Sequence, residues 1–175
     1  LVTGGQRKGS LFAPMHWSDE FSGRARVDAL VAGNADPISG QPELKITPVS
    51  LAPFRAAWQG FAVLARRPEI PSVGYWAIAP APAGFRLELA DSAEPADWPG
   101  FAAQLLFGGQ LGDPLLHYSD TARGERRFAA FKGDRLLGAL YVGRGPVEAS
   151  RAFAVDALGE RHDAAGRAKL LAGRA

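Results

Sequence analysis

Residues 12–45, FAPMHWSDEFSGRARVDALVAGNADPISGQPELK, combine an aromatic-rich turn, a short amphipathic piece and a polar loop, and they lead into a β-branched run. Five side chains that form hydrogen bonds, those of residues 16–20, directly follow the apolar Leu11 and Phe12. Such a row is more typical of the rim of a site than of a buried strand. The alternative is a solvated turn with Trp17 packed onto the core.

Working outward from this stretch, we predict two strands and one helix. Residues 10–13 form the first predicted strand, which Pro14 ends because proline cannot donate to a central ladder. Apolar side chains recur at helical spacing within residues 23–31 and predict a short helix. Residues 46–51 predict a second strand, which lies at an edge or a bulge because it contains Pro48.

Strands and helices alternate in the rest of the chain. Residues 56–66 are long enough for a helix, but Gly60 lies in their middle and the aromatic and branched residues favour a strand, which we choose. The other predicted elements are a hairpin of residues 74–79 and 85–89 with a longer loop, a helix capped by Asp97 and ended by Gly108, a strand from Leu115, a hairpin of residues 127–132 and 136–142, and helices at residues 148–158 and 164–171, the second capped near Asp163.

Composition indicates an ordinary globular chain. Its 175 residues are 47% hydrophobic and 22% charged, which suits one or two modest domains. A boundary falls near Pro53 or Pro68, and we favour Pro53. The predicted fold class is therefore mixed α+β and β-rich, with domains at residues 1–53 and 54–175.

Several classes of function are disfavoured. The net charge of +2 comes from scattered basic residues, so nucleic acid is not indicated. The chain has no cysteine and cannot itself hold an iron–sulfur cluster or give a thiolate to a metal. It shows neither a membrane-length apolar run nor a signal-peptide pattern, and we expect a cytoplasmic protein with no membrane partner.

Three segments resemble one family. GSLFAPMHW at residues 9–17, RVDAL at 26–30 and DPISGQPELK at 36–45 resemble the C-terminal molybdopterin-dinucleotide-binding domain of assimilatory nitrate reductases, which are bis-molybdopterin guanine dinucleotide oxidoreductases. Three segments in the same order are more specific than any one of them. The resemblance is strong over residues 9–49.

The resemblance implies a double-psi β-barrel. Its first strands would precede Leu1, so we expect a fragment in which residues 1–53 are part of the barrel and residues 54–175 are a small α+β extension. In some members a [2Fe–2S] module follows a segment like residues 168–174, and we expect the chain to stop before it.

The resemblance also implies four cofactor-binding residues, His16, Trp17, Asp28 and Lys45. A lysine suits a phosphate or an electron-rich pterin edge, although Lys45 could equally be a solvated strand end. The wider family has asparagine in place of Asp28, and because an ionised aspartate only accepts hydrogen bonds, Asp28 either meets pterin N–H groups or caps the helix. His16 meets the cofactor or loop backbone, and Trp17 covers a heterocycle or packs into the core.

A parent enzyme of this kind reduces nitrate to nitrite at a molybdenum held by two pterin dithiolenes, with electrons from an iron–sulfur cluster elsewhere in the protein. This chain would form one wall of the cofactor site, with no catalytic residue or metal ligand, and would be inactive alone. Its partners would be the remainder of the molybdoenzyme polypeptide and an electron donor protein. The alternatives are another molybdopterin enzyme such as a formate dehydrogenase, or a non-catalytic assembly domain.

Other motifs are weaker. Residues 117–120 alternate between the faces of a strand and do not converge as a triad. The arginines of residues 120–127, DTARGERR, are interpreted as surface charges, and residues 108–112 lack the context of a phosphate loop.

Overall fold

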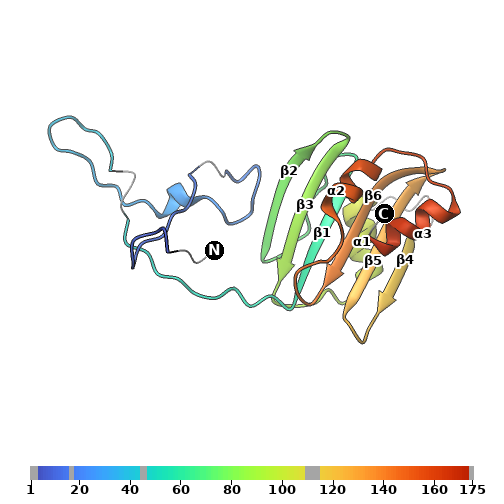
Figure 1. Cartoon of the computed structure of the whole chain (residues 1–175). Helices are drawn as coiled ribbons and strands as arrows, with labels where there is room; N and C mark the ends of the chain where they lie inside the picture. Colours follow the sequence, from blue (N-terminus) through green and yellow to red (C-terminus); the bar gives the residue numbers. More distant parts are fainter. Residues whose placement is uncertain (1–3, 16–17, 44–46, 109–114, 174–175) are drawn as a thin grey trace. The chain divides into compact units, whose positions relative to one another are not determined.

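The computed structural model describes residues 4–15, 18–43, 47–108 and 115–173 (Figure 1). The chain divides into two compact units, Leu1–Pro53 and Phe54–Ala175, which we call the N-terminal and C-terminal units. In the described residues, no helix has both the length and the apolar character needed to span a bilayer.

One six-stranded antiparallel sheet organises the C-terminal unit (Figure 1). Its strands are β1 (Trp58–Leu64), β2 (Tyr75–Ala81), β3 (Gly84–Asp91), β4 (Leu116–Asp120), β5 (Glu125–Lys132) and β6 (Arg135–Gly143). Their order is β2-β3-β1-β6-β5-β4, so β2 and β4 are edge strands and the sheet is open. The sheet therefore does not form a closed barrel.

Strand β1 lies at the centre of the sheet, between β3 and β6. All of its residues except Gln59 are buried. A strand that is covered on both faces has a nearly continuous apolar sequence, which resembles that of a buried helix. This burial explains the ambiguity of residues 56–66, and the choice of a strand is confirmed.

Helices cover both faces of the sheet (Figure 1). The helices are α1 (Trp98–Phe107), α2 (Arg151–Ala157) and α3 (Ala164–Ala172). Trp98 of α1 contacts Trp58, with ring centroids 5.1 Å apart, whereas the guanidinium of Arg151 in α2 lies 4.7 Å from the ring centroid of Phe61. Trp58 and Phe61 are three residues apart in β1 and face opposite sides. The unit therefore has three layers, with α1 on one face and α2 and α3 on the other.

The first hairpin has a tighter turn than the sequence predicts. Strand β2 continues through Pro80 and Ala81, and β3 begins at Gly84, so the turn contains only two residues. The prediction of a longer loop is wrong because β2 is an edge strand, where a missing backbone N–H is tolerated.

The helix ends largely follow the local signals. Gly108 ends α1 in the left-handed conformation, as predicted. The Asp163 carboxylate caps α3 by accepting a 2.7 Å hydrogen bond from the Gly166 backbone N–H, which confirms that prediction. Asp97 occupies the N-cap position of α1, but its side chain makes no capping hydrogen bond.

The N-terminal unit lacks a hydrophobic core in its described part. It contains the 3₁₀ helix η1 (Val27–Leu30) and one isolated bridge between Ala35 and Pro42. The only buried residue among those described is Ser22, while large apolar side chains are exposed, those of Phe12 by 81% and Leu51 by 83%.

The predicted strands of the N-terminal unit are not observed. Residues 10–13 and 47–51 are irregular, and residue 46 lies outside the described part. The partial double-psi barrel is therefore not confirmed. A strand needs a hydrogen-bonded neighbour, and these segments have no partner strand among the described residues. The helix predicted in residues 23–31 is reduced to the single turn η1.

Candidate functional site

Of the four predicted cofactor-binding residues, Asp28 belongs to the described part of the chain. His16, Trp17 and Lys45 lie outside it. Asp28 is the second residue of η1 and does not cap it, because Arg26 occupies the N-cap position. The carboxylate of Asp28 instead lies 3.7 Å from the Arg26 guanidinium.

A small exposed charge group surrounds Asp28. The Arg26 guanidinium donates a 2.9 Å hydrogen bond to Asp19, so it lies between two carboxylates. The side chains of Asp19, Arg26 and Asp28 are each at least half exposed. Exposed ion pairs of this kind add little to stability. The guanidinium of Arg26 and the two carboxylates are therefore all open to solvent.

The neighbouring DPISGQP segment closes on itself. One carboxylate oxygen of Asp36 accepts hydrogen bonds from the Ser39 N–H at 2.7 Å, the Ser39 hydroxyl at 2.9 Å and the Ile38 N–H at 3.0 Å. These bonds, led by that from the Ser39 backbone, lower the pKa of Asp36. The Asp36 N–H also donates to the Gln41 carbonyl at 2.9 Å. These internal hydrogen bonds hold residues 36–41 in one loop conformation.

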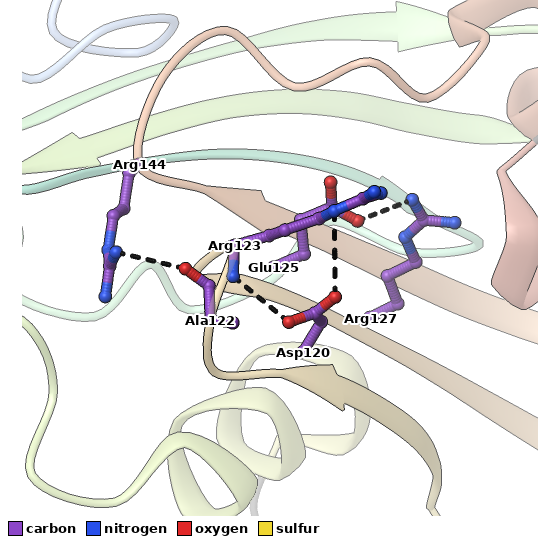
Figure 2. Close-up of polar contacts among 6 residues, drawn as sticks. All are labelled: Asp120, Ala122, Arg123, Glu125, Arg127 and Arg144. Atoms are coloured by element: carbon purple, nitrogen blue, oxygen red, sulfur yellow. Dashed lines mark hydrogen bonds and ion pairs between the residues drawn. The ribbon is translucent and has the colours of Figure 1, made fainter.

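Two hollows of about 280 and 590 Å³ adjoin in the C-terminal unit. Both are lined by the side chains of Arg123, Glu125, Arg127 and Glu148. Figure 2 shows Arg127 paired with the Glu125 carboxylate and Arg123 paired with Asp120. Arg127 donates to Glu125 at 3.0 Å, and Arg123 lies 3.9 Å from Asp120. Both hollows are therefore lined by charges of both signs.

Arg127 has a structural role that its sequence context did not reveal. Its guanidinium donates a 2.8 Å hydrogen bond to the Leu171 carbonyl near the end of α3, where a cation is favoured by the helix dipole. Its side chain is only 20% exposed, compared with 76% for Arg123. The Arg126 side chain is also 20% exposed and pairs with Glu94 at 3.5 Å. The interpretation as a surface charge therefore fits Arg123 and is wrong for Arg126 and Arg127.

Arg144 reaches the same turn from the far end of the last hairpin. It donates to the Ala122 carbonyl at 3.4 Å, and Figure 2 shows it apart from Glu125 and Arg127. Gly124 makes room for it, because a Cβ at that glycine would lie 2.6 Å from the Arg144 Nε. Sequence reasoning missed this contact, since Arg144 follows β6 and no local pattern links it to the turn.

Tyr141 is one of the residues that line the smaller hollow, and it attaches α3 to the sheet. Its hydroxyl donates a 2.9 Å hydrogen bond to the Leu170 carbonyl, and the residue is 1% exposed. Burial raises the pKa of Tyr141 to about 12, partly opposed by the charge of Arg127. Tyr141 and Arg127 together bind consecutive carbonyls at the end of α3.

We expect Tyr141→Phe to lower the free energy of unfolding by about 1 to 3 kcal/mol, because the buried Leu170 carbonyl loses its partner. Urea denaturation of the whole chain measures this loss. Tyr75→Phe, at a residue 39% exposed, is the control and should change stability little. Equal losses in the two variants would contradict this role of the hydroxyl.

The same hydroxyl predicts a loss of stability in alkali. An unfolded tyrosine ionises near pH 10, and the folded pKa of Tyr141 is raised to about 12. The stabilising contribution is therefore complete below about pH 10 and is lost as the pH rises through about 12. The urea midpoint should fall over this interval, and it should fall less in Tyr141→Phe.

No metal-binding group is evident in the described residues. No cluster of three or more histidine, cysteine, aspartate or glutamate side chains among them has the geometry to hold a metal ion.

Comparison with known proteins relates the chain to oxidoreductases. It is 38% identical over 119 residues, or 63% of its length, to a nitrate reductase of Klebsiella oxytoca. Nitrate reductases of Synechocystis sp. and Shewanella frigidimarina are 43% identical over 53 residues and 46% identical over 46 residues, which are 30% and 26% of the chain. No protein-family model matches, and no solved structure gives a significant match.

These relatives are much longer than this chain, which covers 14%, 7% and 5% of their respective lengths. The chain is therefore similar to a part of each of these nitrate reductases.

Proposed function

We propose that this chain is the cofactor-binding C-terminal part of a molybdenum-dependent nitrate reductase, which converts nitrate to nitrite, and that it is inactive alone. The observation that carries this proposal is the 38% identity over 119 residues to the Klebsiella oxytoca nitrate reductase. The chain spans 14% of that protein, so the remaining polypeptide would supply the rest of the active site.

The N-terminal unit supports this proposal. Its described residues form no core, and Phe12, Ile38 and Leu51 expose 81%, 96% and 83% of their surfaces. Several exposed large apolar residues in one small unit are typical of a surface that contacts another part of a protein or a partner protein. The remainder of the enzyme polypeptide is the partner that we propose, with a separate protein as electron donor.

The proposed cofactor is bis-molybdopterin guanine dinucleotide. When bound, its molybdenum supplies the redox chemistry, and this chain binds and orients part of it. The half-exposed Asp28 carboxylate, with Arg26 beside it, fits the N–H donors and polar edges of such a group. Lys45 would bind a phosphate or pterin edge, and His16 and Trp17 would line the same wall. The iron–sulfur cluster would lie elsewhere, because the chain has no cysteine.

The first test is to capture the native protein with an antibody to this chain and measure its intact mass, molybdenum and iron. A mass several times 18.5 kDa with both metals supports the proposal, and a metal-free species of about this mass contradicts it. Turnover of nitrate but not formate then separates nitrate reductase from formate dehydrogenase. Nitrite production by the isolated chain with reduced methyl viologen would contradict inactivity alone.

The second test uses variants of the full-length protein. Lys45→Met should weaken cofactor retention at least about tenfold, since a hydrogen bond to a charged group contributes roughly 1.5 to 3 kcal/mol. Lys132→Met, at the exposed end of β5, is the matched control and should retain the cofactor. Asp28→Asn should also retain it, whereas Asp28→Ala should lose it. Full retention in Lys45→Met would remove that residue from the site.

A further inference from the structure

The loop at residues 35–42 presents an apolar side chain to solvent. Ile38 lies near the middle of this loop and is 96% exposed. Single exposed apolar residues are common on protein surfaces, so exposure alone carries no conclusion. Ile38 differs from an ordinary exposed apolar residue because internal hydrogen bonds hold the loop that carries it.

The loop is held by its own hydrogen bonds. The Ala35–Pro42 bridge closes its base, and the Gly40 N–H donates to the Asp36 carbonyl at 2.8 Å. Gly40 has φ +70, a left-handed conformation that glycine adopts without steric cost. With the three hydrogen bonds to the Asp36 carboxylate, the loop is shaped before it meets any partner.

Several polar groups of this loop are bonded within it, although the residues that carry them are exposed. Asp36 and the Ser39 hydroxyl bind loop atoms, and the Gln41 N–H donates to the Ser39 hydroxyl at 3.3 Å. Ile38 is the large branched apolar side chain of this loop, and it is almost fully exposed. Turn positions usually carry small or polar residues, so a preformed loop with a branched apolar residue at its middle is suited to insertion into an apolar socket. Preorganisation lowers the entropy cost of such binding.

We propose that Ile38 is an anchor that inserts into an apolar socket on the remainder of the same enzyme polypeptide. This inference rests on the proposed function. The residues beside Ile38 are Pro37, Ser39 and Gly40, none of which is charged, and the carboxylate of Asp36 is satisfied within the loop. An uncharged, apolar contact is typical of a permanent interface, whereas transient partners meet through more polar surfaces. The similar Klebsiella oxytoca protein extends far beyond the matched region, so the required partner surface lies within one polypeptide.

The absence of cysteine from the chain permits a direct test. Ile38→Cys is made in the isolated chain and in the full-length polypeptide, and its labelling by a maleimide is followed by peptide mass spectrometry. Lys132→Cys is the matched control on an exposed site of the C-terminal unit. In the isolated chain we expect both thiols to react at similar rates. In the full-length protein we expect the Ile38→Cys thiol to react at least about tenfold more slowly than the control, which reports closure of the socket over the loop.

A second pair of variants, Ile38→Val and Ile38→Asp, tests the anchor without introducing a cysteine. Ile38→Val should leave the thermal midpoint of the full-length protein unchanged, and Ile38→Asp should lower it. Neither variant should change the midpoint of the isolated chain. Unhindered labelling in the full-length protein, or equal midpoints for Ile38→Asp and Ile38→Val, would overturn the anchor.

Molybdenum content of the unmodified full-length protein separates the two proposals. Molybdenum with unhindered labelling overturns the anchor and keeps the proposed function. If the Ile38→Cys thiol is protected but the protein contains no molybdenum, the anchor is supported and the proposed function is overturned.

Discussion

Gly84→Ala is expected to lower the free energy of unfolding of the C-terminal unit by about 3 kcal/mol, the upper end of the usual cost of overpacking. A Cβ at Gly84 would lie 2.1 Å from the Leu64 carbonyl oxygen and 2.8 Å from the Ala65 Cα. Both contacts are with backbone at the end of the central strand β1, which no side-chain rotation relieves. Gly84 also has φ +154, which side-chain-bearing residues rarely adopt. Urea denaturation followed by circular dichroism measures the loss.

Gly133→Ala is the matched control for Gly84→Ala. Gly133 lies in the turn of the β5–β6 hairpin with φ +61, and a Cβ there would meet nothing within 4 Å. Only the left-handed conformation would then be penalised, by roughly 1 to 2 kcal/mol. If the two variants lost equal stability, the close approach to β1 would not be the reason for glycine at position 84.

Trp58→Ala is expected to cost about 4 kcal/mol, within the range for removing a large aromatic side chain from a core. Trp58 is 1% exposed, and its ring meets Trp98 and Phe101 edge to face at centroid distances of 5.1 and 5.6 Å. Its indole N–H donates a 2.8 Å hydrogen bond to the Ala93 carbonyl. The substitution therefore leaves a cavity between β1 and α1 and an unsatisfied carbonyl.

Trp58→Phe separates the parts of this effect. It keeps an aromatic ring against α1 but removes the hydrogen bond to Ala93, and we expect about half the loss of Trp58→Ala. Thermal and urea unfolding of the two variants provide the measurement. Equal stability of Trp58→Ala and the unsubstituted chain would mean that α1 is not held to the sheet through this residue.

The C-terminal unit was largely predictable because its signals are local. Gly133 and Asp134 mark the turn between β5 and β6, and the structure pairs Lys132 with Arg135 around them. Asp163 and Gly108 mark helix ends by contacts within a few residues. Turns and caps depend on residues that are close in the sequence, so they can be predicted from local sequence patterns.

Of the four predicted cofactor-binding residues, Asp28 is the one that the structure describes. The three segments that contain these residues resemble nitrate reductase motifs. The relatives found by comparison are also named nitrate reductase. The contact between Asp28 and Arg26 lies within one turn of chain, yet periodicity indicates only the helix and says nothing of how the two side chains lie. The strands expected in the N-terminal unit depended on partner strands that its described residues do not contain.

Local signals in the sequence predicted the alternation of strands and helices in residues 54–175, the turn between β5 and β6 and the helix ends at Gly108 and Asp163. The sequence motifs also carried the resemblance to nitrate reductases. The packing of elements that are distant in the sequence places β1 at the centre of the sheet, puts α1 and α3 on opposite faces, and brings Arg127 and Tyr141 to the end of α3. The Arg127 guanidinium and the Leu171 carbonyl are 44 residues apart in the chain. Contacts of that kind form because both groups must be satisfied once the sheet and helix are packed, and no local pattern specifies them.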